Sequence, residues 1–105
     1  MLWRKISLRN HEDKLVGNTV ETRAIICGVL STGSAGITVD FMRQSLPIID
    51  AVEAASSAQV DHVVIPYTQW ILLCGSVNAY RFSVGGRAVL AAIDDIINAE
   101  EVDAP

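Results

Sequence analysis

Apolar residues recur at helical spacing along most of the chain, and only its beginning alternates between apolar and polar positions. Within the first ten residues, Ile6 and Leu8 lie on one side and polar residues on the other, a pattern that predicts a short strand or an extended arm. After a polar break, Leu15 and Val16 predict a second short strand, which Gly17 ends. We therefore expect residues 1–17 to form an amino-terminal arm or a β-hairpin.

The first predicted helix spans residues 19–31. Asn18 and Glu21 have the spacing of a capping box, with Asn in the place of the usual Ser or Thr. The apolar residues of this segment then follow at helical spacing, at Val20, Ala24, Cys27 and Leu30. Small residues at 31–36 predict a loop after this helix.

A second helix is predicted to follow, with Thr38 as its cap. Asp40 then lies in the first turn, where a carboxylate suits the helix dipole. The side chains expected to point inward are Phe41, Met42, Leu46, Ile49 and Val52. Pro47 lacks the N–H of an internal helical hydrogen bond, so we expect a kink or a break near Ser45. Residues 59–64 are expected to connect this helix to the next.

Two further helices complete the predicted elements. Pro66 suits the first turn of a third helix over residues 66–80, with Trp70, Leu73 or Cys74, and Val77 on its main apolar face. Ser83 is a candidate cap for a fourth helix over residues 84–98, whose apolar stripe is Val89, Ile93, Ile96 and Ile97. The acidic residues 99–105 are expected to fray.

Four helical segments with short joints predict a mostly α fold. We expect a small helical bundle of about four helices, with the arm or hairpin at its amino terminus. The chain has 105 residues, which is the usual size of one domain, so a single helical domain is predicted over residues 1–105.

Composition adds the prediction of a self-association surface. Residues 63–80 contain no charged side chain, half of the whole chain is apolar, and only 19% of it is charged. A small sphere cannot hide that much apolar surface, so the uncharged segment is expected to be buried in the core or against another copy of the chain. We predict a homo-oligomer, because most soluble oligomers are symmetric. The predicted self-association interface consists of Trp70, Leu73, Cys74, Val77 and Tyr80.

The same segment reaches the minimum length of a membrane-spanning helix. It contains Pro66 and several polar residues, however, so burial within protein is the better interpretation. The first fourteen residues lack the apolar stretch that a signal peptide needs. We expect a cytoplasmic protein with no membrane partner.

Charge indicates a protein partner rather than a nucleic acid. The net charge is −4, and phosphate binding depends on clustered Lys and Arg, so no direct contact with nucleic acid is expected. The basic residues gather near the amino terminus and the acidic ones at the carboxyl end. The two ends can attract each other within or between chains, although a solvated tail and a solvated amino-terminal face are the simpler interpretation. Trp3, Arg4 and Arg9 are the candidate partner-binding residues, with Trp3 as an anchor or as a lid over the core.

Signatures of catalysis, metal binding and cofactor binding are absent from the sequence. Cys27 and Cys74 stand in apolar runs without histidines at zinc-ligand spacing, so reduced buried thiols are expected. His62 follows Asp61, but no nucleophile accompanies this pair. The segment GVLSTGSAG has the glycine spacing of a phosphate-binding loop without its lysine, and a flexible joint is the better interpretation. We expect a non-enzymatic protein without a cofactor.

The order of these segments resembles that of small helical proteins encoded by tailed phages and prophages. The resemblance covers most of the chain from Leu15 onward and rests on the segments TVETRAIICGVL, TVDFMRQSLPIIDAVEAA, VDHVVIPYTQWILLCG and SVGGRAVLAAIDDII. The chain departs from that pattern in Pro47 and in the few charges of its third helix. The resemblance implies no catalytic residues, only a small accessory or regulatory protein that acts through contacts.

The leading hypothesis is therefore a protein-interaction module that self-associates and binds another protein, for instance a phage-type regulator that sequesters a repressor or a host factor. A virion or tail assembly chaperone, or a minor structural protein, is the first alternative. The second is a small-ligand-binding protein with a pocket around Met42, Trp70 and His62.

Overall fold

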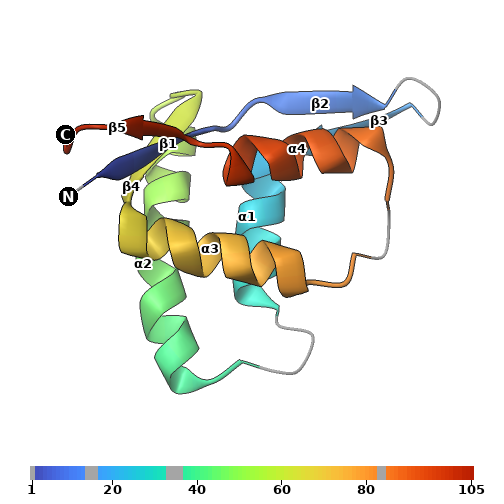
Figure 1. The fold of residues 1–105 in the computed structure, drawn as a ribbon. Helices are drawn as coiled ribbons and strands as arrows, with labels where there is room; N and C mark the ends of the chain where they lie inside the picture. The colour runs from blue at the N-terminus through green and yellow to red at the C-terminus, as the bar shows by residue number, and fades with distance from the viewer. Residues whose placement is uncertain (1, 14–16, 33–36, 83–84) are drawn as a thin grey trace.

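The computed structural model describes residues 2–13, 17–32, 37–82 and 85–105. These residues form four helices and five strands (Figure 1). In chain order the elements are β1 (Trp3–Ser7), β2 (Asn10–Asp13), β3 (Asn18–Glu21), α1 (Thr22–Ser31), α2 (Val39–Ser57), β4 (His62–Pro66), α3 (Tyr67–Ala79), α4 (Arg87–Ile97) and β5 (Glu100–Val102).

The amino-terminal segment forms the central strand of a three-stranded antiparallel sheet with the order β4-β1-β5. Trp3 lies opposite Pro66 on one side and Val102 on the other. Both chain ends therefore lie side by side at one edge of the molecule (Figure 1). The tail predicted to fray is instead paired over Glu100–Val102, because β1 offers it an open edge.

A separate hairpin follows β1. Strands β2 and β3 pair antiparallel, with Asn10 opposite Glu21 and Asp13 opposite Asn18, and the hairpin packs along α4 (Figure 1). The hairpin predicted from the sequence thus has later strands than expected. Leu15 and Val16, the predicted second strand, lie outside the described residues.

The predicted mostly α bundle is wrong, because the chain has an α+β fold in which two sheets accompany the helices. Each missed strand is short, and pairing across the fold stabilises it more than its own residue pattern does. Strand β4 was expected to be a connector and β3 the first turn of a helix. Strand β5 carries two glutamates in three residues, so it has no apolar alternation.

Helix α1 consequently begins at Thr22, later than predicted. Glu21 occupies the cap position without a side-chain cap hydrogen bond, so the predicted capping box is not formed. The Thr22 hydroxyl, which is fully buried, donates to the carbonyl of Arg9 over 2.9 Å and connects the helix to the residue just before β2.

Helix α2 is capped as predicted but is rotated relative to the expected inward face. Thr38 accepts a hydrogen bond from the Phe41 amide over 3.1 Å. Its buried residues are Ser45, Ile48 and Val52, whereas Met42 and Leu46 are 43% and 53% exposed. The helix continues through Pro47, so no break occurs near Ser45. Pro47 itself is exposed. Water can therefore donate a hydrogen bond to the backbone carbonyl that lacks an N–H partner because of the proline.

Helices α3 and α4 agree with prediction along most of their length. Pro66 caps α3 from the end of β4, and Leu73 and Val77 are buried. Helix α4 begins at Arg87, after Gly86 with its φ of +122°, and the predicted cap Ser83 lies outside the described residues.

The core lies between the inner sheet face and the four helices. Its largest fully buried apolar side chains are Ile6, Ile26, Leu30, Ile48, Ile65, Leu73, Ile96 and Val52.

Candidate functional site

The three-stranded sheet buries only one of its faces. Side chains alternate along a strand, and Ile6, Val63 and Ile65 point into the core with exposures of 0%, 5% and 1%. The opposite side chains are all half-buried or exposed. We call this side the outer face, and its residues are Trp3, Lys5, Ser7, His62, Val64, Pro66, Glu100 and Val102.

The outer face changes from apolar to polar along β1. The register places Pro66, Trp3 and Val102 in one row across the three strands. The next row holds Val64, Lys5 and Glu100, and the last holds His62 and Ser7. Trp3, in the middle of the apolar row, is half-buried rather than covered by another element. Its exposed part offers an aromatic surface on the central strand, at one end of the outer face.

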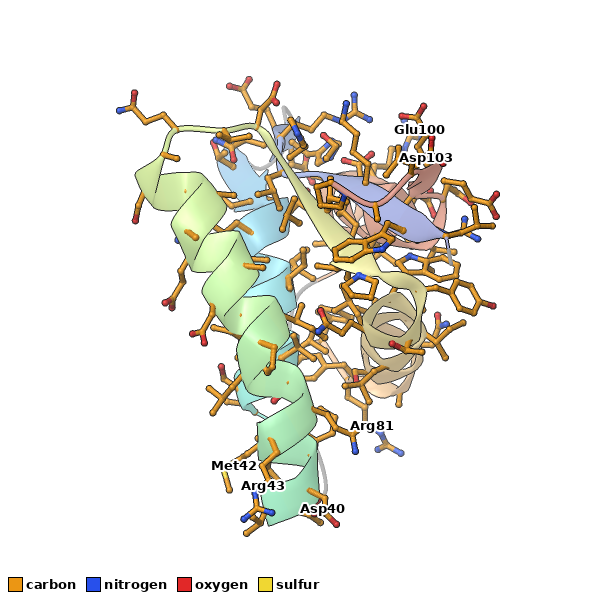
Figure 2. All side chains as sticks on the ribbon, turned by 90° about the vertical axis from the view of Figure 1, so that its left-hand side faces the viewer. Asp40, Met42, Arg43, Arg81, Glu100 and Asp103 are labelled. Atoms are coloured by element: carbon orange, nitrogen blue, oxygen red, sulfur yellow. The ribbon has the colours of Figure 1, made fainter. Side chains whose placement is uncertain are left out.

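A polar hollow of about 420 Å³ adjoins this apolar row. Strand β1, the approach to β4 and the carboxyl end of α4 form its walls. Its lining residues are Lys5, Ser7, Asp61, His62, Asp94, Asp95, Asn98, Ala99 and Glu100, and we call it the acidic hollow because four carboxylates face one lysine. Figure 2 shows Glu100 near Asp103, which adds a further acidic group at this end of the molecule.

Two histidines contact carboxylates of the acidic hollow. His62 Nδ1 lies 3.1 Å from Asp61 Oδ1, and this hydrogen bond lowers the pKa of Asp61. His11 Nε2 lies 2.6 Å from Asp95 Oδ2 on the far wall. Both contacts favour the charged form of the carboxylate.

Asp95 is the best-anchored of these carboxylates. Arg9 donates to it through Nε over 3.0 Å and through Nη2 over 2.9 Å, in the two-pronged geometry typical of strong Arg–carboxylate pairs. Partial burial raises the pKa of Asp95, but the hydrogen bonds from Arg9 and His11 outweigh it and hold this pKa below its usual value. Because Asp95 belongs to α4 and His11 to β2, the cluster fixes the hairpin to the helix.

Of the predicted partner-binding residues, the structure places only Trp3 on the outer face. Arg4 points to the opposite face, where Nη2 donates to Glu101 over 2.8 Å and Nη1 donates to the Ala99 carbonyl over 3.2 Å. Its guanidinium carbon also lies 4.3 Å from the ring centre of Trp70. Arg9 is paired with Asp95. The attraction between the two chain ends thus occurs within one chain. Arg9 and Glu101 nevertheless stay 65% and 51% exposed, so both ends are also in contact with solvent, as the simpler interpretation expects.

The predicted self-association residues lie mostly inside the fold. Leu73 and Val77 are 0% and 2% exposed in the chain's own core. Trp70 is half-buried, and its Nε1 donates to the Ile96 carbonyl over 2.8 Å. Cys74 is half-buried, and this burial raises the pKa of its thiol. Tyr80 packs edge-on against Phe82, with ring centres 4.8 Å apart. No continuous apolar surface from these five residues faces solvent.

The proposed ligand pocket around Met42, Trp70 and His62 is not formed. Met42 lies near the free end of α2, and His62 follows its other end, about 20 Å away at the rise of an α-helix. Trp70 faces Arg4 instead.

Sequence reasoning missed most of the outer face. Alternation in the segment HVVIP offered a signal for Val64 and Pro66, because Val63 and Ile65 between them are apolar. Lys5 was visible as the polar side of the first strand. Val102 had no local signal, since it joins this surface through pairing with a strand almost the whole chain away.

Within the described ranges, no group of three or more His, Cys, Asp or Glu side chains is placed to hold a metal ion. Among the helices in the described part of the chain, none has the length and apolar character to cross a membrane. Comparison of the chain with protein-family models, with curated proteins and with solved structures gives no match.

Proposed function

We propose that the chain is a non-enzymatic protein-interaction module of the cytoplasm, which binds a segment of another protein on its outer face. The observation that carries this proposal is the position of Trp3. It lies on the central strand of a half-exposed sheet face, at the end of that face formed by Pro66, Trp3 and Val102, near a hollow with an excess of carboxylates. Tryptophan is enriched among the residues that dominate binding energy at protein interfaces.

The chemistry of the outer face selects the partner segment. An aromatic or large aliphatic side chain fits the row formed by Pro66, Trp3 and Val102. A lysine or arginine a few positions away then reaches the acidic hollow, where its charge is complementary and steers association. The partner segment is therefore apolar and basic.

The resemblance to phage-encoded proteins suggests the setting. In that setting the chain is a regulator that sequesters a repressor or a host factor through this segment. A virion or tail assembly chaperone, or a minor structural protein, would present the same face to a tail component, and the identity of a co-purifying protein separates the two roles.

Selection from a random peptide library on the immobilised protein tests the proposal. Enriched peptides are expected to combine an aromatic or large aliphatic residue with a nearby lysine or arginine. Calorimetry on a synthetic copy of one such peptide then compares variants that circular dichroism shows to be folded. Trp3→Ala is expected to weaken binding by about thirtyfold, the effect of losing about 2 kcal/mol from an interface hot spot.

Ile71→Ala is the matched control for Trp3→Ala. Ile71 is a large apolar residue, 48% exposed on α3 and outside the outer face, so its loss leaves the affinity unchanged. Asp94→Lys reverses one charge of the acidic hollow and is expected to weaken binding with little effect on the fold. The proposal fails if no peptide is enriched, or if the enriched peptides bind Trp3→Ala as tightly as wild type.

An apolar hollow favours a small-ligand-binding protein as a second candidate. It has a volume of about 320 Å³, lies between β3, α1 and α4, and includes Tyr80 and Phe82 in its wall. Screening of small apolar compounds by thermal shift tests it. A ligand at one hundred times its dissociation constant is expected to stabilise the fold by about 2.7 kcal/mol. Phe82→Asp removes that stabilisation if the hollow is the site.

A further inference from the structure

Helix α2 carries an apolar stripe on the side turned away from the core. Val39, Met42 and Leu46 stand at helical spacing and are 58%, 43% and 53% exposed. Figure 2 shows the end of α2 with Asp40, Met42 and Arg43 reaching beyond the other helices. Large neighbouring apolar side chains on a surface typically mark a contact site.

Two opposite charges stand along one flank of this stripe. Arg43 and Asp50 are seven positions apart, which is two turns of the helix, so both lie on the same side of Leu46. Both residues are exposed. Among the described residues, neither Arg43 nor Asp50 makes an ion pair or a side-chain hydrogen bond. Their charges are free to pair with a second molecule.

The spacing of these charges is self-complementary. Two copies of α2 can be laid antiparallel with a two-fold axis at Leu46. The numbers of two residues that face each other across this axis then add up to about 92. Arg43 of each copy then lies next to Asp50 of the other, on the same flank. Met42 faces the half-buried Ile49 of the other copy on the opposite flank, and the two Leu46 side chains meet on the axis. A parallel arrangement leaves Arg43 and Asp50 at different heights, without this reciprocal pairing.

We propose that a second copy of this chain covers the stripe, in an antiparallel α2–α2 dimer joined by two Arg43–Asp50 pairs. The interface goes beyond the proposed function, because the end of α2 that carries Asp40, Met42 and Arg43 lies at the opposite end of the molecule from Glu100 (Figure 2). Met42, Leu46 and Ile49 of each copy make the apolar contact, while Val39 faces the exposed Glu53 of the other copy. This contact is small, so we expect a dissociation constant on the order of 100 μM.

Analytical ultracentrifugation over a concentration series from about 10 μM to about 1 mM tests the dimer, the range in which such weak contacts populate. Wild type is expected to shift from monomer to dimer. Leu46→Asp, which places two carboxylates on the axis, is expected to remain monomeric. Ile71→Asp is the matched control, because it introduces the same charge at an equally exposed apolar position of α3, and it retains the dimer.

A charge exchange tests the antiparallel geometry. Arg43→Asp and Asp50→Arg alone are each expected to weaken the dimer at least tenfold, because each puts like charges together. The double variant restores both pairs in reversed order and is expected to regain wild-type association. A wild-type monomer at the highest concentration overturns the proposal, as does a folded double variant that stays as weak as the single ones. Peptide binding to the outer face, measured on the same variants, stays unchanged, so failure of either proposal is visible separately.

Discussion

Arg4 links both chain ends to α3, and removing its side chain is expected to destabilise the fold measurably. The side chain is only 17% exposed. It lies over the ring of Trp70, donates to the Ala99 carbonyl and pairs with Glu101 of β5. Arg4→Ala removes all of these contacts together and leaves the Ala99 carbonyl without this donor.

The contacts differ in strength. The hydrogen bond to Ala99 contributes about 1 kcal/mol, and the cation–π contact over Trp70 contributes about 1 kcal/mol in this partly desolvated position. The pair with Glu101 adds only about 0.5 kcal/mol, because Glu101 is 51% exposed. The buried Nε of Arg4 has no hydrogen-bond partner in the described structure, and this lowers the net stability that Arg4 contributes. With the lost packing of the aliphatic stem, Arg4→Ala is expected to lower the free energy of unfolding by about 2–3 kcal/mol.

Urea unfolding followed by far-ultraviolet circular dichroism measures this loss. Arg81→Ala is the control, because Arg81 is exposed and, in the described structure, pairs with no other side chain, so its removal is expected to change stability by less than about 0.5 kcal/mol. Arg4→Lys keeps the charge and the stem but loses the planar two-pronged donor, and an intermediate loss is expected. The reasoning is refuted if Arg4→Ala destabilises the protein no more than Arg81→Ala does.

Three other changes test separate parts of the fold. Because folding lowers the pKa of Asp95, its cluster stabilises the fold above the ordinary aspartate pKa of 3.8 and loses this contribution as the pH falls through the lower folded value. The stability difference between wild type and Asp95→Asn should therefore shrink on acidification, and a constant difference would contradict this reasoning. Leu73→Ala removes a fully buried side chain and is expected to cost about 3 kcal/mol in urea unfolding, whereas a loss near zero would place Leu73 outside the core. Deletion of residues 100–105 removes β5 and is expected to cost about 2 kcal/mol, while a freely frayed tail would cost nothing.

The helices could be predicted from the sequence because the residues that mark the start of a helix lie within a few positions of it. Thr38 caps α2 through a hydrogen bond three residues away, and Pro66 precedes α3 with a fixed φ. Which face of α2 points into the core could not be predicted in the same way. Met42 and Leu46 are larger and more apolar than Ser45, yet Ser45 lies inside, because its hydroxyl donates to the carbonyl of Met42 and α1 packs against that side of the helix.

The sheet could not be predicted because its signals are not local. Strand β1 alternates and was identified, but its partners begin at residues 62 and 100. The candidate site depends on that pairing, since Pro66 and Val102 lie beside Trp3 only in the folded sheet. Trp3 itself could be singled out from the sequence. Alternation along the strand also places Arg4 on the face opposite Trp3, but its partners Glu101 and Trp70 are brought to it only by the fold.

The central position of β1 also has a consequence for the order of folding. Among the three strands of its sheet, β1 is the first to leave the ribosome, and Arg4 reaches Glu101 across 97 positions. Closing so long a loop is entropically unfavourable and slow, so the sheet is complete only when the last residues of β5 are free. Ile6, however, lies opposite Val63 of β4, whereas β5 pairs only with Trp3, Arg4 and Lys5. Strand β1 is therefore unpaired only until β4 emerges, and a nascent chain stalled before residue 62 is expected to be sensitive to protease within β1.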